Sequence, residues 1–299
     1  MGKIAFVFSG QGDQYPGMGR ELAEKYPAAA AVFEMCDLLR PGTSAQCFEG
    51  SEEELKETGN TQPCLFAMEL AAAAVLTEKG VHPDVAAGFS LGEVTAAAFS
   101  GIFDSETGFR LVCRRGELMQ REAEKFDTSM AAVVKLAPEQ VMTICGRYSG
   151  VYPVNFNCPG QITVSGLTGQ MAGFFAEIRE AGGRAIPLKV RGAFHSPFMT
   201  VAAADFAREL AAAELHRGSI PLYSDMTAEP YSENAAELLS QQICSPVLWE
   251  KLIRNMIGAG VDTFIEVGPG RTLTNMTAKI DPGVRALTAL DIIREVEGC

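Results

Sequence analysis

The most constraining stretch of the chain is a serine between two glycines, at the junction of an apolar segment and a helix-forming run. Asp84 to Gly88 reads as a strand, Ser90 stands between Gly88 and Gly92, and an alanine-rich run follows at once. This Gly-x-Ser-x-Gly spacing is typical of a nucleophile elbow, a strand-to-helix turn too tight for a Cβ at either glycine. The serine hydroxyl then lies at a helix N-terminus, where free N–H groups favour negative charge. The pattern alone is equally compatible with a glycine-rich turn that carries an idle serine.

Composition excludes several classes of function. The chain has 299 residues, 47% of them hydrophobic and 21% charged, as expected of a folded globular protein without long disordered regions. The formal charge of -12 weighs against nucleic acid or an anionic membrane as a partner. No apolar run approaches the ~18 residues of a membrane span, and the first residues do not resemble a signal peptide. The eight cysteines include no C-x-x-C pair and indicate reduced thiols, so we expect a cytoplasmic protein.

The order of predicted elements indicates an α/β fold. Residues 4–8 form a continuous β-branched and aromatic run, typical of a parallel strand buried on both faces. The glycine-rich loop after it is not a nucleotide loop, because Tyr15 stands where a dinucleotide fingerprint needs glycine and Met18 where a P-loop needs lysine. Helices are then predicted at 20–39 with a break near Pro27, at 52–57, from Thr61 or Pro63 to 79, and at 105–125.

The order of the predicted helices and strands changes in the middle of the chain. Between 131 and 190 the pattern reads β-α-β-β-α-β, the order of a ferredoxin-like unit. An α/β pattern resumes afterwards, with a last strand expected at 285–289. We therefore predict a large α/β-hydrolase-like catalytic lobe with a parallel sheet, residues 1–126 and 192–299, and an inserted small ferredoxin-like lobe, residues 127–191. The cleft between them, at the carboxyl ends of the parallel strands, is the expected site.

A serine nucleophile needs a base, and the chain has three histidines. His82 and His216 read as solvated turn or cap residues. His195 lies at the hinge where the small lobe returns to the large one and is the favoured base over a structural role. In an ordinary serine hydrolase the histidine comes late and follows an acidic residue, whereas about a hundred residues follow His195 and no Asp stands in an obvious orienting loop.

Seven motifs, taken together and in order, resemble the malonyl-CoA:acyl carrier protein transacylases, a family that includes the acyltransferase domains of fatty acid and polyketide synthases. The resemblance covers nearly the whole chain. Each motif is weak alone, but their common order is specific. They are Gly10 to Gln14, Gly88 to Glu93, Arg115-Gly116 with Met119-Gln120, Asn155 to Gln161 with Ser165-Gly166, Phe194 to Ser196, Gln242 with Ser245 to Val247, and Glu266 to Gly270.

The resemblance implies a role for each matching catalytic residue. Ser90 would attack the thioester and carry the acyl group, and His195 would act as general base and then acid. The backbone N–H groups of Gln11 and Leu91 would form the oxyanion hole. The main-chain carbonyl of Gln242 would orient His195 in place of a carboxylate.

The resemblance also implies a substrate pocket. Arg115 reads from its neighbours as a solvated helix residue paired with Glu117 or Gln120, but the matching family arginine binds the malonyl carboxylate in a bidentate pair. Phe194 matches relatives that take malonyl, and Met119 belongs to the same motif as Arg115. Phe89 departs from the family, which usually has histidine before the serine; this makes the pocket wall more apolar and puts fine acyl preference in doubt. Asn157 reads either as a cleft hydrogen-bonding residue or as an ordinary turn residue.

The expected function is that of an [acyl-carrier-protein] S-malonyltransferase. It would move malonyl from malonyl-CoA to the phosphopantetheine thiol of acyl carrier protein through a malonyl-serine intermediate, with no metal and no cofactor besides the coenzyme A thioester. It would supply extender units for fatty acid or polyketide synthesis, and the sequence leaves both pathways open. The alternative is a serine thioesterase or esterase-type hydrolase of the same fold; a non-catalytic carrier-binding subunit is disfavoured because Ser90, His195, Arg115 and Gln11 are all present.

Overall fold

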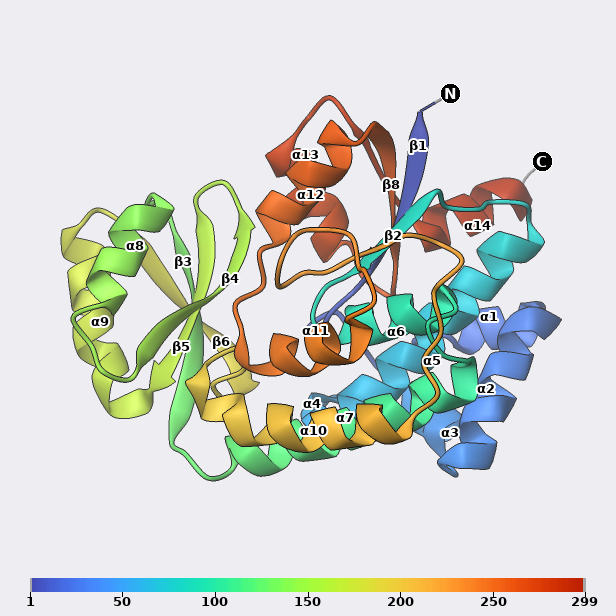
Figure 1. Cartoon of the computed structure of the whole chain (residues 1–299), viewed down its shortest axis with the longest axis horizontal. Helices are drawn as coiled ribbons and strands as arrows, with labels where there is room; N and C mark the ends of the chain where they lie inside the picture. Colours follow the sequence, from blue (N-terminus) through green and yellow to red (C-terminus); the bar gives the residue numbers. More distant parts are fainter. Residues whose placement is uncertain (1, 298–299) are drawn as a thin grey trace.

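The computed structural model describes residues 2–297 and contains two separate sheets (Figure 1). The first sheet has five parallel strands in the order β7-β2-β1-β8-β9. The second has four antiparallel strands in the order β4-β5-β3-β6. The predicted combination of a parallel α/β lobe and a separate small sheet is confirmed. The strands of the first sheet are β1 (Lys3–Phe8), β2 (Val85–Gly88), β7 (Leu222–Tyr223), β8 (Val261–Val267) and β9 (Arg285–Thr288).

The central strand β1 explains why both faces of the parallel sheet are covered. Phe6 and Phe8 pack on one side, in the core formed with α5, α6 and α7. Ala5 and Val7 point to the other side, into a core that includes Trp249. Successive side chains of a strand point to opposite faces, so an unbroken apolar strand needs helices on both.

Helices on the first face are α5 (Thr58–Glu78), α6 (Leu91–Phe99) and α7 (Ser105–Ala123), with α10 (Thr200–Ala212) beyond them (Figure 1). Helices α12 (Trp249–Gly258) and α13 (Thr272–Ile280) cover the second face. The remaining helices are α1 (Arg20–Lys25), α2 (Pro27–Leu39), α3 (Thr43–Glu49), α4 (Glu52–Lys56), α11 (Ala235–Gln241), α14 (Ala289–Glu297) and the short 3-10 turns η1 (Pro197–Met199) and η2 (Gln242–Cys244).

The small lobe has the predicted β-α-β-β-α-β order. Its core is formed by apolar residues of the sheet packed against its two helices. The sheet order, with the first and third strands of the unit in the centre, is the ferredoxin-like one. The elements are β3 (Thr128–Val134), α8 (Pro138–Cys145), β4 (Val151–Cys158), β5 (Gln161–Leu167), α9 (Thr168–Glu180) and β6 (Arg184–Arg191), all within the predicted segment 127–191.

The carboxyl ends of three parallel strands meet at one edge of the first sheet. Phe8 of β1 pairs with Gly88 of β2 on one side and with Val267 of β8 on the other. The loops that follow these residues therefore start side by side. They hold the glycine-rich segment after β1, the elbow serine, and the Gly268–Gly270 turn.

Several boundaries differ from the sequence-based expectation. The break at Pro27 is present, but α5 begins at Thr58 and carries Pro63 within its first two turns. Helices α3 and α14 were not predicted. Within the part of the chain that the structure describes, no helix is long and apolar enough to cross a membrane.

Candidate active site

Ser90 occupies a strained turn that only glycine neighbours permit. Its backbone has φ 53° and ψ -104°, outside the conformations that a side chain prefers. A Cβ on Gly88 would come within 2.0 Å of the Glu93 nitrogen, and one on Gly92 within 2.3 Å of the Phe8 carbonyl oxygen. Strand β2 and helix α6 thus meet at the tight elbow that the spacing predicts.

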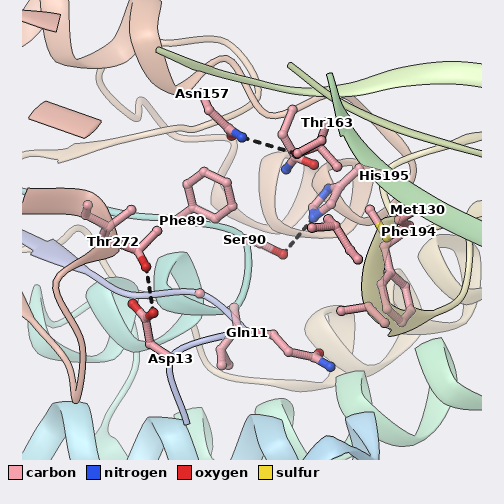
Figure 2. Close-up of a pocket in the computed structure, with 18 of the residues that line it drawn as sticks. Gln11, Asp13, Phe89, Ser90, Met130, Asn157, Thr163, Phe194, His195 and Thr272 are labelled. Carbon is pink, nitrogen blue, oxygen red and sulfur yellow. Dashed lines mark hydrogen bonds between the residues drawn. The ribbon is translucent and has the colours of Figure 1, made fainter. Parts of the chain in front are cut away.

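His195 reaches the serine hydroxyl from the connection that follows β6. Its Nε2 lies 2.7 Å from Ser90 Oγ, and the two side chains point toward each other across the pocket (Figure 2). The His195 backbone also has a positive φ of 59°, and its N–H donates to the Ile243 carbonyl at 3.1 Å. The imidazole is therefore already held against Ser90 and needs no hinge movement to reach it.

Two main-chain carbonyls fix the tautomer of His195. Its Nδ1 lies 2.9 Å from the Gln242 carbonyl oxygen and 3.2 Å from that of Ser245. Both partners only accept, so Nδ1 carries the proton and Nε2 is free to accept from Ser90. Burial, together with the positive charge of Arg115, lowers the pKa of His195 to about 4. The imidazole is accordingly neutral near pH 7.

Arg115 is fully buried beside the serine, which contradicts the solvated helix residue that its neighbours suggested. Its guanidinium, which extends from α7, donates to Ser90 Oγ at 3.2 Å, to Gln242 Oε1 at 2.7 Å and to Gln62 Oε1 at 2.9 Å. Burial lowers the pKa of Arg115 to about 10, so it still carries its charge at pH 7. Its Nε finds no acceptor among the described residues.

Gln11 and Leu91 line the same pocket as Ser90. Leu91 is the first residue of α6, where a backbone N–H has no intrahelical acceptor. Gln11 lies in the loop after β1, next to the elbow (Figure 2). The structure therefore places both residues in the pocket that holds the Ser90 hydroxyl, and their role as oxyanion-hole donors stays a prediction.

The pocket has a volume of about 280 Å³ and is lined by residues of both lobes. Phe194, Met119, Phe89 and Asn157 all line it, as predicted. The Phe89 ring packs edge-on against Trp249, with centroids 5.3 Å apart. Asn157 donates from Nδ2 to Thr163 Oγ1 at 3.1 Å, whereas its buried Oδ1 has no partner among the described residues. This unused acceptor favours the cleft role of Asn157 over the turn role.

Sequence reasoning missed four residues around the nucleophile. Gln62 and Ser245 contact Arg115 and His195. Asp225 accepts the Ser90 N–H at 2.6 Å, so the buried acid lies behind the nucleophile and not beside the histidine. Glu93, from the elbow motif itself, accepts from Gln242 Nε2 at 2.7 Å. Glu93 could have been found from its place in the motif, but nothing near Gln62 or Asp225 in the sequence marks them.

Comparison with known proteins agrees with this geometry. The family model described as the acyl transferase domain matches residues 5–286. A malonyl CoA-acyl carrier protein transacylase of Bacillus subtilis is 37% identical, over 97% of this chain and 94% of the relative. The crystal structure of a malonyl CoA-acyl carrier protein transacylase from Clostridium perfringens superimposes with a TM-score of 0.93 at 35% identity, covering 99% of this chain and 98% of that one.

A second solved structure is a malonyl-transacylase in complex with a type II PKS acyl-carrier protein. It matches with a TM-score of 0.91 at 32% identity, over 96% of this chain and 94% of that one. The match extends over both lobes, and both the histidine and the arginine contact the serine hydroxyl. The chain belongs to the acyl transferase domain family.

Proposed function

We propose that the protein is a malonyl-CoA:acyl carrier protein transacylase that carries malonyl on Ser90. The observation that supports this most directly is the contact of the Ser90 hydroxyl with both His195 and the buried guanidinium of Arg115. The first group can take the hydroxyl proton, and the second can bind a free carboxylate. Relatives of nearly equal length carry the same activity in their names.

In the first half-reaction Ser90 Oγ bonds to the thioester carbonyl carbon while its proton moves to His195 Nε2. The carbonyl electrons move to the oxygen, which the N–H groups of Gln11 and Leu91 stabilise by several kcal/mol. Collapse of this intermediate breaks the carbon–sulfur bond. The coenzyme A thiolate leaves with the proton from His195, and malonyl remains as an ester on Ser90.

Arg115 selects the acyl group in this proposal. Ser90 and Gln62 line the pocket and lie between it and the guanidinium, whose Nε has no acceptor among the described residues; a malonyl carboxylate that enters past them would meet this group. A planar, bidentate pair is then available, and lysine could not reproduce it. Because the site is buried, such a pair is stronger than one in water.

In the second half-reaction the phosphopantetheine thiol of an acyl carrier protein gives its proton to His195 and attacks the malonyl ester. The proton then returns to Ser90 Oγ as the ester bond breaks. The related transacylase that was solved with its acyl-carrier protein supports this partner. The product is an extender unit for fatty acid or polyketide synthesis, and each step uses only groups of the chain and the two thiols.

We also propose a cytoplasmic location. Support comes from the cysteines in the described part of the chain, which are free thiols.

The test is intact-protein mass spectrometry after mixing with malonyl-CoA. Wild type should gain one malonyl group, Ser90→Ala none, and Ser149→Ala, which changes an exposed serine, the same increment as wild type. Adding holo acyl carrier protein should remove the group and load the carrier. If the isolated acyl-enzyme loses malonyl to buffer as fast as to the carrier, the protein is a hydrolase.

A further inference from the structure

Two buried carboxyl groups lie directly behind the nucleophile, and the reaction as proposed uses neither. Glu93 extends from the first turn of α6, and Asp225 lies in the loop after β7; both side chains are fully buried. The Asp225 N–H donates to Glu93 Oε2 at 3.1 Å, which links the two residues directly. Two adjacent buried carboxylates repel each other strongly, so such a pair keeps a proton.

The two carboxyl groups have different partners. Glu93 accepts from three donors: the Asp225 N–H, Gln242 Nε2 and the Tyr231 hydroxyl. Asp225 accepts the Ser90 N–H through Oδ2, while its buried Oδ1 has no donor among the described residues. Three donors suit an ionised carboxylate, and a lone oxygen beside a carboxylate suits a carboxylic acid O–H.

The pair clamps the strained backbone of Ser90 on both sides. Asp225 holds the Ser90 N–H, and Gln242 Nε2, itself bonded to Glu93, donates to the Ser90 carbonyl at 2.9 Å. Gln242 also accepts from Arg115 and positions His195 through its main-chain carbonyl. Serine, histidine and arginine are thus all tied to one buried cluster.

We propose that Glu93 and Asp225 share a single proton, held on Asp225, and act as a positioning pair that fixes Ser90 for acyl transfer. With one proton the pair carries one negative charge, which balances Arg115. A second charge there would oppose both the incoming malonyl carboxylate and the oxyanion. Burial and the adjacent Glu93 raise the pKa of the Asp225 carboxyl well above its ordinary value, in agreement with a protonated acid.

Asparagine is the closest neutral substitute for a protonated aspartic acid, so Asp225→Asn gives the sharpest test. The readouts are the rate of Ser90 acylation by malonyl-CoA and the KM and kcat of transfer to the carrier, measured from about pH 6 to about pH 8.5, where Arg115 stays charged. The titratable groups that interact with Asp225 are Glu93, Arg115 and Tyr231. Over this range His195, whose pKa is about 4, is neutral, and Arg115, whose pKa is about 10, stays charged. Burial raises the pKa of Tyr231 well above its ordinary value, so an alkaline loss reports Asp225.

We expect Asp225→Asn to acylate within about threefold of wild type at pH 7 and to lose the alkaline decline of the wild-type profile. Asp225→Ala should lower kcat at least tenfold with little change in KM. Glu93→Gln should lose at least tenfold as well, because it removes the negative charge that balances Arg115. Asp84→Asn is the matched control: its carboxylate accepts the Ile4 N–H at 2.8 Å, away from Ser90, and its profile should equal that of wild type.

The proposal is overturned if Asp225→Asn is as slow as Asp225→Ala, if it keeps the wild-type alkaline decline, or if Glu93→Gln is tolerated. Should Glu93→Gln fail to fold, the pH profile of Asp225→Asn still tests the proposal. The inference rests on acyl transfer by Ser90, so the rate of Ser90 labelling by a fluorophosphonate provides an independent readout. If the wild type reacts with the fluorophosphonate but not with malonyl-CoA, malonyl-CoA is not the acyl donor and the proposed function is wrong. The relative labelling rates of the Asp225 and Glu93 variants then still test the positioning pair.

Discussion

His195 is a neutral base because it is buried beside a positive charge. Only its neutral form can take the Ser90 proton, and its pKa lies near 4, below the ordinary 6.5. Activity should therefore persist as the pH falls through 6.5 and be lost only as the pH approaches the lowered value. A pH profile of kcat/KM for malonyl transfer checks this, and an acid limb near pH 6.5 would contradict it.

Arg115 should control the choice of acyl group. Arg115→Ala removes the carboxylate partner but leaves the Ser90–His195 contact, so malonyl transfer should fall about 10- to 100-fold, as expected for a lost charge-assisted hydrogen bond. Acetyl transfer should fall less. Arg115→Lys is the matched control, because it keeps the charge without the planar fork. The measurement is kcat/KM with malonyl-CoA and with acetyl-CoA. An unchanged ratio of these two values would show that Arg115 does not select the acyl group.

At the scale of elements, the elbow depends on close approach of strand and helix. Gly92→Ala would place a Cβ 2.3 Å from the Phe8 carbonyl oxygen, so we expect the free energy of unfolding to fall by about 3 kcal/mol or more. Gly169→Ala in α9 is the control, since no atom lies within 4 Å of its Cβ position. That change should stabilise the helix by about 0.5–1 kcal/mol. Denaturant unfolding measures both, and equal effects would contradict the packing at the elbow.

Helices and strands were predicted correctly where the signal for them lies in a few neighbouring residues. Ser51 and Glu54 form a capping box at the start of α4, where a helix is predicted at 52–57, and the buried run of β1 marks the central strand. The start of α5 was predicted too late, at Thr61 or Pro63, because proline usually occupies the first turn of a helix. The helix begins at Thr58 and contains Pro63. No side chain caps the N-terminus of helix α3, so the sequence lacks this signal for the start of a helix.

The residues of the candidate site were likewise predictable only where their signals lie in the neighbouring sequence. Ser90 and His195 carry local signals: a glycine-flanked turn and a rare residue at a lobe boundary. The burial of Arg115 could not be read from its own helix, where it is Arg114 that forms the exposed ion pair with Glu117 that the sequence suggested for Arg115. Asp225 lies 135 positions beyond Ser90 in the sequence, so their contact exists only in the tertiary fold. Such contacts depend on the sheet order, which local sequence does not encode.

At the scale of the whole molecule, the two lobes are joined beside the active site by main-chain hydrogen bonds. Phe156 N–H of β4 donates to the Val247 carbonyl at 2.8 Å, and Val247 N–H donates to the Val154 carbonyl at 2.9 Å. The segment that holds Gln242 and Ser245, whose carbonyls orient His195, is therefore hydrogen-bonded through Val247 to β4 of the small lobe. An aromatic contact also joins the lobes, where the rings of Tyr152 in β4 and Phe198 lie 6.0 Å apart.

We therefore expect the lobes to move as one body around the pocket. Native-state hydrogen exchange should find the amides of Phe156 and Val247 nearly as protected as that of Val7 in β1, because opening them requires the lobes to separate. Phe198→Ala should lower the free energy of unfolding by about 1 kcal/mol through the lost ring contact, while unfolding stays a single transition. If both amides exchange much faster than the strands of either sheet, the lobes open independently. The Ser90–His195 contact would then be only one state of a mobile cleft.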